Sequence, residues 1–221
     1  MNYIDENEFK RRVFDLGAES DRVEFLGDEI LYELCLKYPR HDIKSQIYAK
    51  VWLIGRAYAV ALERGKTTDT VVNDFFYQDV VSKIQSSDID KVFDKLRSTN
   101  CKTDDILKVY IELIKLTKTF NRGTKHSFCS KYLHFHFPEL FFIYDSRAVS
   151  NISKIKLDIS KYMNNSIETR DLPYLKFYYK CLALQELIQE KFNIHLTPRQ
   201  IDTFLLKDEN EKLQNNFILN K

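Results

Sequence analysis

The chain has 221 residues, of which 44% are hydrophobic, and this is enough to bury a sizeable core in one domain or two small lobes. Its 34 basic and 32 acidic residues nearly balance, so composition alone does not indicate a polyanion partner. Five glycines and four prolines are too few for the many tight turns of a β-sandwich or barrel. We therefore predict an all-α fold of about eight to ten helices.

The spacing of the cysteines and the absence of long apolar runs indicate the cellular compartment of the protein. Four cysteines lie far apart and form no CxxC pair, at Cys35, Cys101, Cys129 and Cys181. No apolar segment follows a basic start, and no window reaches the ~20 apolar residues of a membrane span. We therefore expect a reduced, cytoplasmic protein that does not enter a membrane.

Apolar residues recur at every third or fourth position along most of the chain, which predicts a succession of amphipathic helices. Two helices are predicted within residues 6–38, with a break at Gly17, and a central helix within Ser45–Gly65. The next predicted helices lie within residues 69–84, 87–98 and 102–120.

The second half of the chain continues this helical pattern. A helix is predicted from Asp145, another with Pro173 in its first turn, and a last one with Thr197 as its cap and Pro198 at its first position. We expect a single helical domain over residues 1–221, in which the polar loop near 164–171 can separate two lobes.

The stretch NRGTKHSFCSKYLHFHFPELFFIYDSRA stands out from the other helices. Gly123–Lys125 predicts a tight turn, and the residues after it begin a helix whose free backbone N–H groups suit an anion such as a DNA phosphate. An apolar helix follows, Pro138 ends it, a short extended segment comes next, and Asp145 stands where another helix begins.

Basic residues gather on and after the preceding helix, at Lys108, Lys115, Lys118, Arg122, Lys125 and Lys131. They form either a solvated helix face or a surface that contacts phosphates. If the partner is a nucleic acid, the expected backbone contacts are Lys118, Arg122, Gly123 and Thr124.

This order of residues resembles the helix-hairpin-helix DNA glycosylases, and within them the 8-oxoguanine DNA glycosylase type in its small bacterial stand-alone form. The resemblance covers about Phe120 to Arg147. It implies an all-helical fold, DNA as partner, Lys125 as nucleophile and Asp145 as its essential partner. The closing segment TPRQIDTFLL also resembles that of small bacterial proteins with this fold, some of them encoded beside antiviral genes.

The residue types fit the chemistry that the resemblance implies. Cleavage of an N-glycosidic bond builds positive charge on the sugar, so a carboxylate such as Asp145 stabilises the transition state while an amine such as Lys125 attacks C1′. A base flipped out of the stack needs flat side chains around it, and the candidates are Phe141, Phe142, Tyr144 and Trp52. Large aromatic residues also commonly pack in hydrophobic cores, so the alternative role of these four is core packing.

Other interpretations of the same residues remain open. Asp145 can be only a helix cap, and Lys131, six residues into the helix, is a rival nucleophile. If the stretch is an active site, we expect the Lys125 amine and the Asp145 carboxylate to lie within ~6 Å across a shared pocket.

The hairpin lacks the proline and first glycine that the family carries before its lysine, since this chain has only Phe-Asn-Arg-Gly. This motivates a second hypothesis, a non-catalytic module of the same fold that binds a nucleic acid or a protein, as an accessory in bacterial antiviral defence. Zinc-type side chains also occur nearby, at His126, Cys129, His134 and His136. Because residues i and i+2 of a helix face different sides, we favour packing roles for them and expect neither metal nor cofactor.

Overall fold

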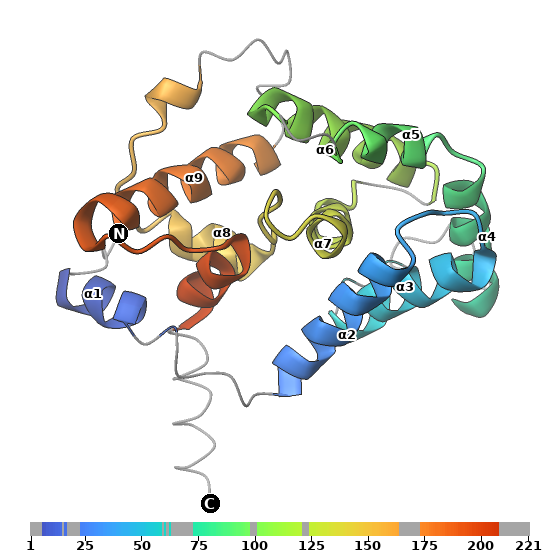
Figure 1. Ribbon diagram of the computed structural model, residues 1–221, viewed down its shortest axis with the longest axis horizontal. Helices are drawn as coiled ribbons and strands as arrows, with labels where there is room; N and C mark the ends of the chain where they lie inside the picture. Colours follow the sequence, from blue (N-terminus) through green and yellow to red (C-terminus); the bar gives the residue numbers. More distant parts are fainter. Residues whose placement is uncertain are drawn as a thin grey trace, which may run out of the picture. The chain divides into compact units, whose positions relative to one another are not determined.

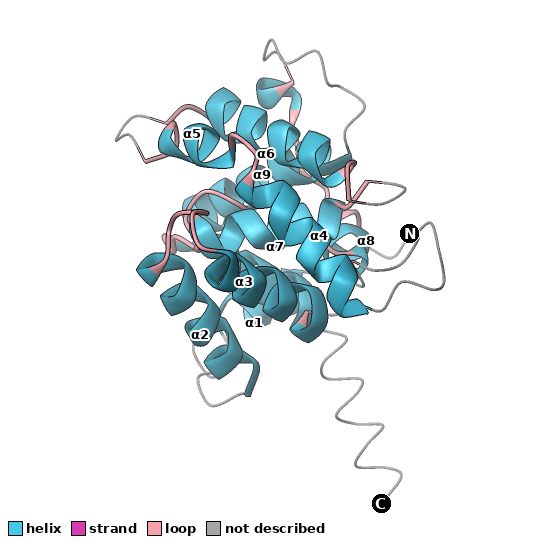
Figure 2. Cartoon of the chain, turned by 90° about the vertical axis from the view of Figure 1, so that its right-hand side faces the viewer, coloured by secondary structure: helices cyan, strands magenta, loops and turns pink. Residues whose placement is uncertain are grey.

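The computed structural model describes residues 6–14, 16, 23–58, 60, 62, 73–97, 101–120, 124–163 and 173–207. Within these ranges the regular structure is helical, with α-helices α1 to α9, a further helix over residues 198–207, and no strand (Figures 1 and 2). The predicted all-α fold of eight to ten helices is confirmed. None of the helices in the described ranges has the length and apolar character needed to cross a membrane.

The chain divides into two compact units. Unit 1 combines residues 1–23 with 142–221, and unit 2 is the continuous stretch 24–141. The predicted loop near 164–171 lies within the range of unit 1 and outside the described residues. The elements on its two sides pack together, because the rings of Tyr162 and Tyr179 stack at 5.6 Å and 3°.

Unit 2 is built around helix α7. Its helices are α2 (Val23–Lys37, of which the first residue belongs to unit 1), α3 (Lys44–Ala57), α4 (Asn73–Gln85), α5 (Ile89–Asp94), α6 (Thr103–Thr117) and α7 (His126–His136). Helix α7 contacts both α3 and α6 and lies between them in Figure 1. Phe128 to Phe135 are all buried, and these residues include the polar side chains of Ser130, Lys131 and His134. A helix covered on all sides needs partners within the protein for such buried polar groups.

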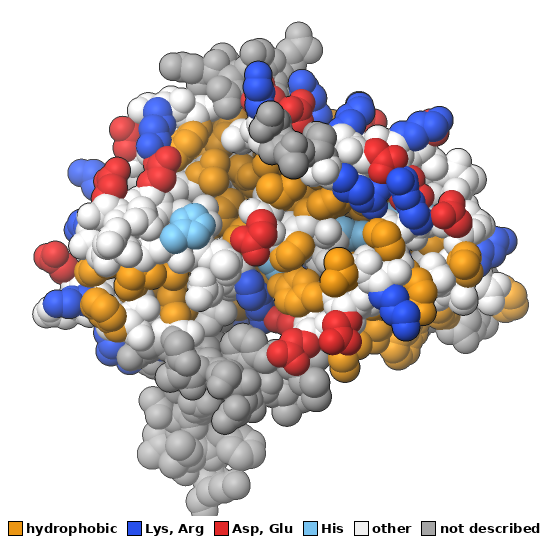
Figure 3. Space-filling view, in the orientation of Figure 1, with side chains coloured by type: hydrophobic (Ala, Val, Ile, Leu, Met, Phe, Trp, Pro, Cys, Tyr) orange, Lys and Arg blue, Asp and Glu red, His pale blue; other side chains and the backbone are white. Residues whose placement is uncertain are grey.

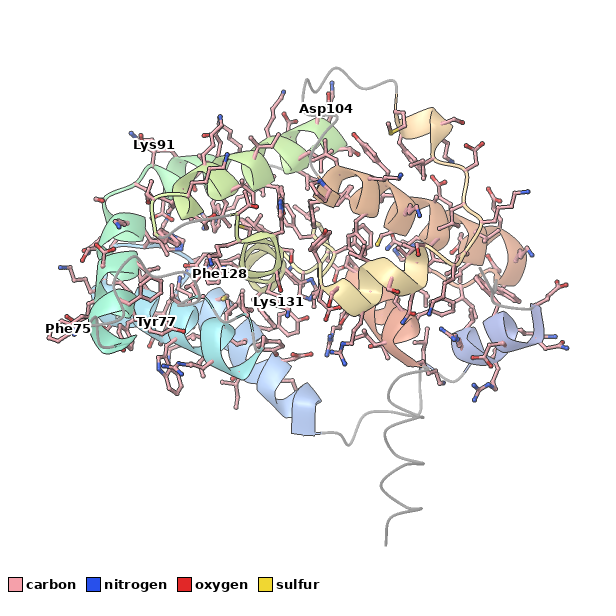
Figure 4. The ribbon with its side chains drawn as sticks, turned by 180° about the vertical axis from the view of Figure 1, so that it is seen from behind. Phe75, Tyr77, Lys91, Asp104, Phe128 and Lys131 are labelled. Carbon is pink, nitrogen blue, oxygen red and sulfur yellow. The ribbon has the colours of Figure 1, made fainter. Side chains whose placement is uncertain are left out.

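Helices α3 and α4 approach closely at a glycine. A Cβ atom added to Gly55 would lie 2.6 Å from the Tyr77 hydroxyl oxygen, so a larger residue would displace that ring. Figure 4 shows the Tyr77 side chain turned into the unit and Phe75 turned away from it, in agreement with their burial and exposure. The absence of a side chain at Gly55 therefore sets the spacing of this helix pair.

Helix α3 ends earlier than the sequence pattern predicts, at Ala57 instead of near Gly65. Tyr58 leaves the helical backbone conformation, with φ −96° and ψ 18°. Its carbonyl accepts a hydrogen bond from Lys131 of α7 at 3.2 Å, and its hydroxyl donates to Asp28 of α2. These tertiary contacts give Tyr58 partners other than the next helical turn.

Unit 1 contains α1 (Glu6–Phe14), α8 (Ser146–Ile152), a 3-10 turn η2 (Ser160–Tyr162), α9 (Pro173–Phe192) and the helix over 198–207. The helix over 198–207 accepts hydrogen bonds from side chains of α1 and α8. Buried Arg12 of α1 donates to the Phe204 carbonyl, and Asn151 of α8 donates to the Leu205 carbonyl at 2.7 Å. Helix α8 also packs on α9.

The predicted starts of the last two helices are confirmed. Helix α9 begins at Pro173, whose missing N–H would have no helical partner in the first turn. Thr197 caps the helix over 198–207 in a reciprocal arrangement. The Gln200 N–H donates to its hydroxyl at 3.3 Å, and the Gln200 side chain accepts from the Thr197 N–H at 2.9 Å.

Candidate functional site

The candidate site begins with the turn between α6 and α7 in unit 2. Helix α6 ends at Thr117 with Lys118 as its C-cap, and α7 begins at His126 with Lys125 as its N-cap. Lys118 and Thr124 are exposed and Lys125 is half-buried. Two of the predicted nucleic-acid contacts, Arg122 and Gly123, lie outside the described residues. The described residues confirm the helix before Lys125 and the helix after it, whereas the predicted turn at Gly123 lies outside them.

Lys125 marks the start of α7 through its backbone. Its carbonyl accepts the Cys129 N–H at 2.9 Å, which closes the first helical turn, and its side chain makes no capping bond. The following residue ties the two helices together, because His126 Nδ1 lies 2.7 Å from the Tyr110 hydroxyl of α6. Burial and the nearby Lys118 charge lower the pKa of His126. The lysine therefore stands at a fixed helix start.

Lys131, the rival nucleophile, is buried on α7 and labelled in Figure 4. Its ammonium donates to the Tyr58 carbonyl at 3.2 Å and lies 5.8 Å from the centre of the Tyr58 ring. The Tyr58 hydroxyl in turn donates to the buried Asp28 carboxylate. This lysine, tyrosine and aspartate form a small polar group that the sequence pattern did not indicate, since 73 residues separate Lys131 from Tyr58.

Acidic neighbours reduce the basic surface predicted on α6. Lys108 lies 3.8 Å from Asp105, and Lys115 lies 2.7 Å from Glu112. Both are exposed pairs one helical turn apart, which contribute little to stability but lower the local positive charge. Acidic and basic side chains are interspersed on the face that Figure 3 shows. The surface favours phosphate less than the lysine spacing alone suggests.

Asp145 lies in unit 1 and caps α8. Its backbone is extended, with φ −137° and ψ 167°, and its Oδ1 atom accepts the N–H groups of Arg147 and Ala148, each at 2.9 Å. Its Oδ2 atom lies 3.7 Å from the Arg147 guanidinium, and 18% of the side chain is exposed. The predicted capping role of Asp145 is confirmed, and one carboxylate oxygen performs it.

Lys125 belongs to unit 2 and Asp145 to unit 1. The ~6 Å approach expected for an amine and a carboxylate that influence each other's titration therefore stays a prediction.

The four aromatic candidates for a base pocket differ in exposure. Phe141 and Phe142 are 0% and 2% exposed, so both are core residues with no ring face open to a base. Burial overrides the base-stacking role expected of them. Tyr144 is half-buried against aromatic rings of α9, and Trp52 on α3 is 42% exposed. Only these two of the four keep surface for contact with a ligand.

The histidines of α7 face different protein groups. His134 donates from Nδ1 to the Phe141 carbonyl at 2.7 Å, and its Nε2 lies 2.5 Å from the Tyr32 hydroxyl. His136 donates from Nδ1 to the Tyr132 carbonyl at 2.8 Å. Among the described residues no group of three or more His, Cys, Asp or Glu side chains is placed to hold a metal ion.

Two hollows lie away from Lys125, Asp145 and the aromatic candidates, and the first of them is lined in part by Glu112 and Lys115 of α6. One, of about 190 Å³, lies between α5 and α6, and the other, of about 280 Å³, lies beside α1 and α9. The second is lined by apolar residues that include Phe9 and Phe192 and by the charged residues Glu6, Lys154, Lys156 and Lys191. None of the predicted site residues lines either hollow.

Comparison with known proteins adds no family to this description, since the chain matches no protein-family model, no curated protein and no solved structure. Interpretation of the site therefore rests on its residues and on the order of its helices.

Proposed function

We propose that the protein is a DNA N-glycosylase/lyase-like enzyme that acts on a damaged or modified base. Lys125 supplies the amine nucleophile and Asp145 the carboxylate that stabilises the transition state. The supporting observation is the order of elements between α6 and α8. Lys125 stands at the start of α7, a turn and a segment without regular structure follow α7, and Asp145 caps the next helix.

The proposed reaction passes through a covalent intermediate on Lys125. The neutral Lys125 amine attacks C1′, the C1′–N bond to the base breaks, and the base leaves with the bonding electrons and takes up a proton. The Asp145 carboxylate offsets the positive charge that develops on the sugar. Loss of the amine proton and opening of the sugar ring give a Schiff base, from which removal of a C2′ proton expels the 3′ phosphate. The target base must first leave the stack.

Trapping the Schiff base tests this proposal. Duplexes that carry oxidised or deaminated bases are incubated with the full chain and sodium borohydride, which reduces the imine to a stable amine. Peptide mass spectrometry should locate the adduct at Lys125. The Lys125→Ala variant should lose it, whereas Lys131→Met, which keeps an apolar stem at the buried position, should retain it. An adduct at Lys131 would reassign the nucleophile, and no adduct with any lesion would contradict the proposal.

A second candidate function is supported by the acidic partners on α6. Because Asp105 and Glu112 lie beside Lys108 and Lys115, the surface suits weak or non-catalytic contact with a nucleic acid. In this alternative the protein is a binding module of the same fold, with a nucleic acid or a protein as partner, in bacterial antiviral defence. Binding that weakens with salt and leaves DNA intact would favour this function. Affinity for a protein without any for nucleic acid would indicate a scaffold.

A further inference from the structure

A buried hydrogen-bond network joins α7 to three other parts of unit 2. In its first branch, the Tyr132 hydroxyl of α7 lies 2.8 Å from His41 Nε2, and His41 Nδ1 lies 2.8 Å from Asp90 Oδ1 of α5. The His41 backbone N–H also donates to Asp90 Oδ2 at 2.9 Å. Tyr132 and His41 are 0% and 2% exposed. This branch links α7 through the loop after α2 to α5.

The second branch starts from a buried lysine of α3. Lys50 is 0% exposed, and its ammonium donates to the carbonyls of Tyr38 and Arg40 at 2.8 and 3.2 Å. Its third acceptor is Nε2 of His136 on α7, at 3.3 Å. An ammonium has three protons and finds three acceptors here, so the charged form of Lys50 satisfies every group. The rings of His41 and His136 stack at 5.4 Å and connect the two branches.

The partners fix the protonation of both imidazoles. Asp90 can only accept, so His41 carries its proton on Nδ1 and accepts the Tyr132 hydroxyl at Nε2. His136 donates from Nδ1 to the Tyr132 carbonyl and accepts from Lys50 at Nε2. A second proton on His136 would point at the Lys50 ammonium, and a second proton on His41 would make the Tyr132 hydroxyl accept from Nε2 and give up the bond that it donates.

We propose that this network is an acid-sensitive latch that holds α7 against α3, α5 and the loop after α2, and that opens when His41 or His136 takes up a proton. The titratable and charged groups around the two imidazoles are Cys35 of α2, Lys50 of α3, Asp90 of α5, Arg97 after α5, and Tyr132 of α7.

The electrostatics of these groups agree with the geometry. Burial and the Lys50 charge lower the pKa of His41 to about 4 against the favourable pull of Asp90, and burial, Lys50 and His41 hold the pKa of His136 well below its usual range. Burial lowers the pKa of Lys50 to about 8, which leaves it charged at neutral pH. Burial raises the pKa of Asp90, but the bonds from His41 outweigh this and lower it, so Asp90 stays an anion in mild acid.

The lowered pKa values of the two histidines determine whether the stability of the fold rises or falls with pH. An unfolded histidine binds its proton near pH 6.5, whereas His41 in the folded protein does so near pH 4. Above pH 6.5 neither state is protonated and the latch contributes fully. As the pH falls from about 6.5 toward 4, the unfolded state gains protons that the folded state refuses, and stability is lost. Lys50 adds no slope in this window, because it is charged in both states.

The test compares the full chain with the double variant His41→Gln/His136→Gln, since glutamine can donate and accept but does not titrate. Urea unfolding is followed between pH 7.5 and 4.5 by the fluorescence of Trp52, the single tryptophan, which lies on α3 in unit 2. In the wild type the folding constant should fall by up to about tenfold per pH unit for each histidine. The double variant should lose the part of this slope that His41 and His136 contribute, and the lowered pKa of His126 leaves a remainder. His195→Gln, which changes an exposed histidine of unit 1, is the matched control and should keep the full slope.

An unchanged pH slope in the double variant would overturn the proposal. If that variant does not fold, nitrogen-15 NMR of the wild-type histidines decides the question. His41 and His136 should remain neutral with the proton on Nδ1 down to about pH 5. Titration of either ring near pH 6.5 in the intact folded protein would equally overturn the latch. Hydrogen exchange should show that α7 amides lose protection at pH 5 in the wild type and keep it in the double variant.

Discussion

Replacing Asp145 separates the capping of α8 from the proposed chemistry. Asp145→Ala removes the acceptor of two N–H bonds, both at 2.9 Å, from a helix of seven residues. Loss of such a cap costs about 1–2 kcal/mol, which corresponds to a fall of roughly 2–8 °C in the melting temperature of a chain of this size. Asp145→Asn keeps an acceptor oxygen and loses only the charge, so it should cost about 0.5 kcal/mol.

Two measurements on the same three proteins distinguish the roles. Thermal unfolding followed by far-UV circular dichroism should rank wild type, Asn and Ala in decreasing stability. Single-turnover base release should instead place the two variants together, each slower by about 10²–10³, because both lack the negative charge that the transition state needs. The two rankings differ only if the carboxylate has both functions.

Either measurement can refute part of the reasoning. An Asp145→Asn variant with the wild-type rate of base release would remove the electrostatic role and leave Asp145 as a cap. An Asp145→Ala variant as stable as the wild type would show that the two N–H groups find other partners, and the capping argument would be wrong.

Two further predictions concern packing and charge. Gly55→Ala should lower the free energy of unfolding by about 1–2 kcal/mol, because the new methyl group displaces buried Tyr77, whereas Gly27→Ala, with nothing within 4 Å of its Cβ, should raise it by about 0.5–1 kcal/mol. Urea unfolding measures both, and the opposite ranking would show that α3 and α4 are not in close contact. If the chain binds DNA, Lys118→Gln should reduce the salt dependence of binding by about one counterion, while Lys91→Gln, an exposed change on α5, should not. Equal effects of the two lysines would indicate non-specific attraction.

Short-range signals in the sequence predicted the helices well. The proline at 173 and the Thr197 cap each act within one helical turn, so the residues that determine these helix starts are neighbours in the chain. The role of Asp145 as the cap of α8 was predictable for the same reason. The predicted end of helix α3 was wrong, because Tyr58, which follows the last helical residue, makes its contacts with α2 and α7. These partners are distant in the sequence.

The buried polar groups could not be predicted in this way. Tyr132 and His41 are 91 residues apart, and Lys50 and His136 are 86 apart, so no local pattern links them. A lysine within an apolar helix is ordinarily expected to reach solvent with its ammonium. Lys50 is buried instead because two backbone carbonyls and an imidazole replace its water. The fold class follows from periodicity, whereas these contacts follow from tertiary packing.

The division of the chain has a consequence for synthesis on the ribosome. Unit 2 is one continuous stretch, residues 24–141, so its helices can pack before the second segment of unit 1, residues 142–221, has been made. Helix α1 has no such opportunity, because Arg12 donates to a carbonyl 192 residues later, at Phe204. At typical translation rates this interval lasts about 10 to 40 seconds. During that time Phe9 of α1 lacks Phe192 and Phe204, the two rings against which it packs in the folded chain.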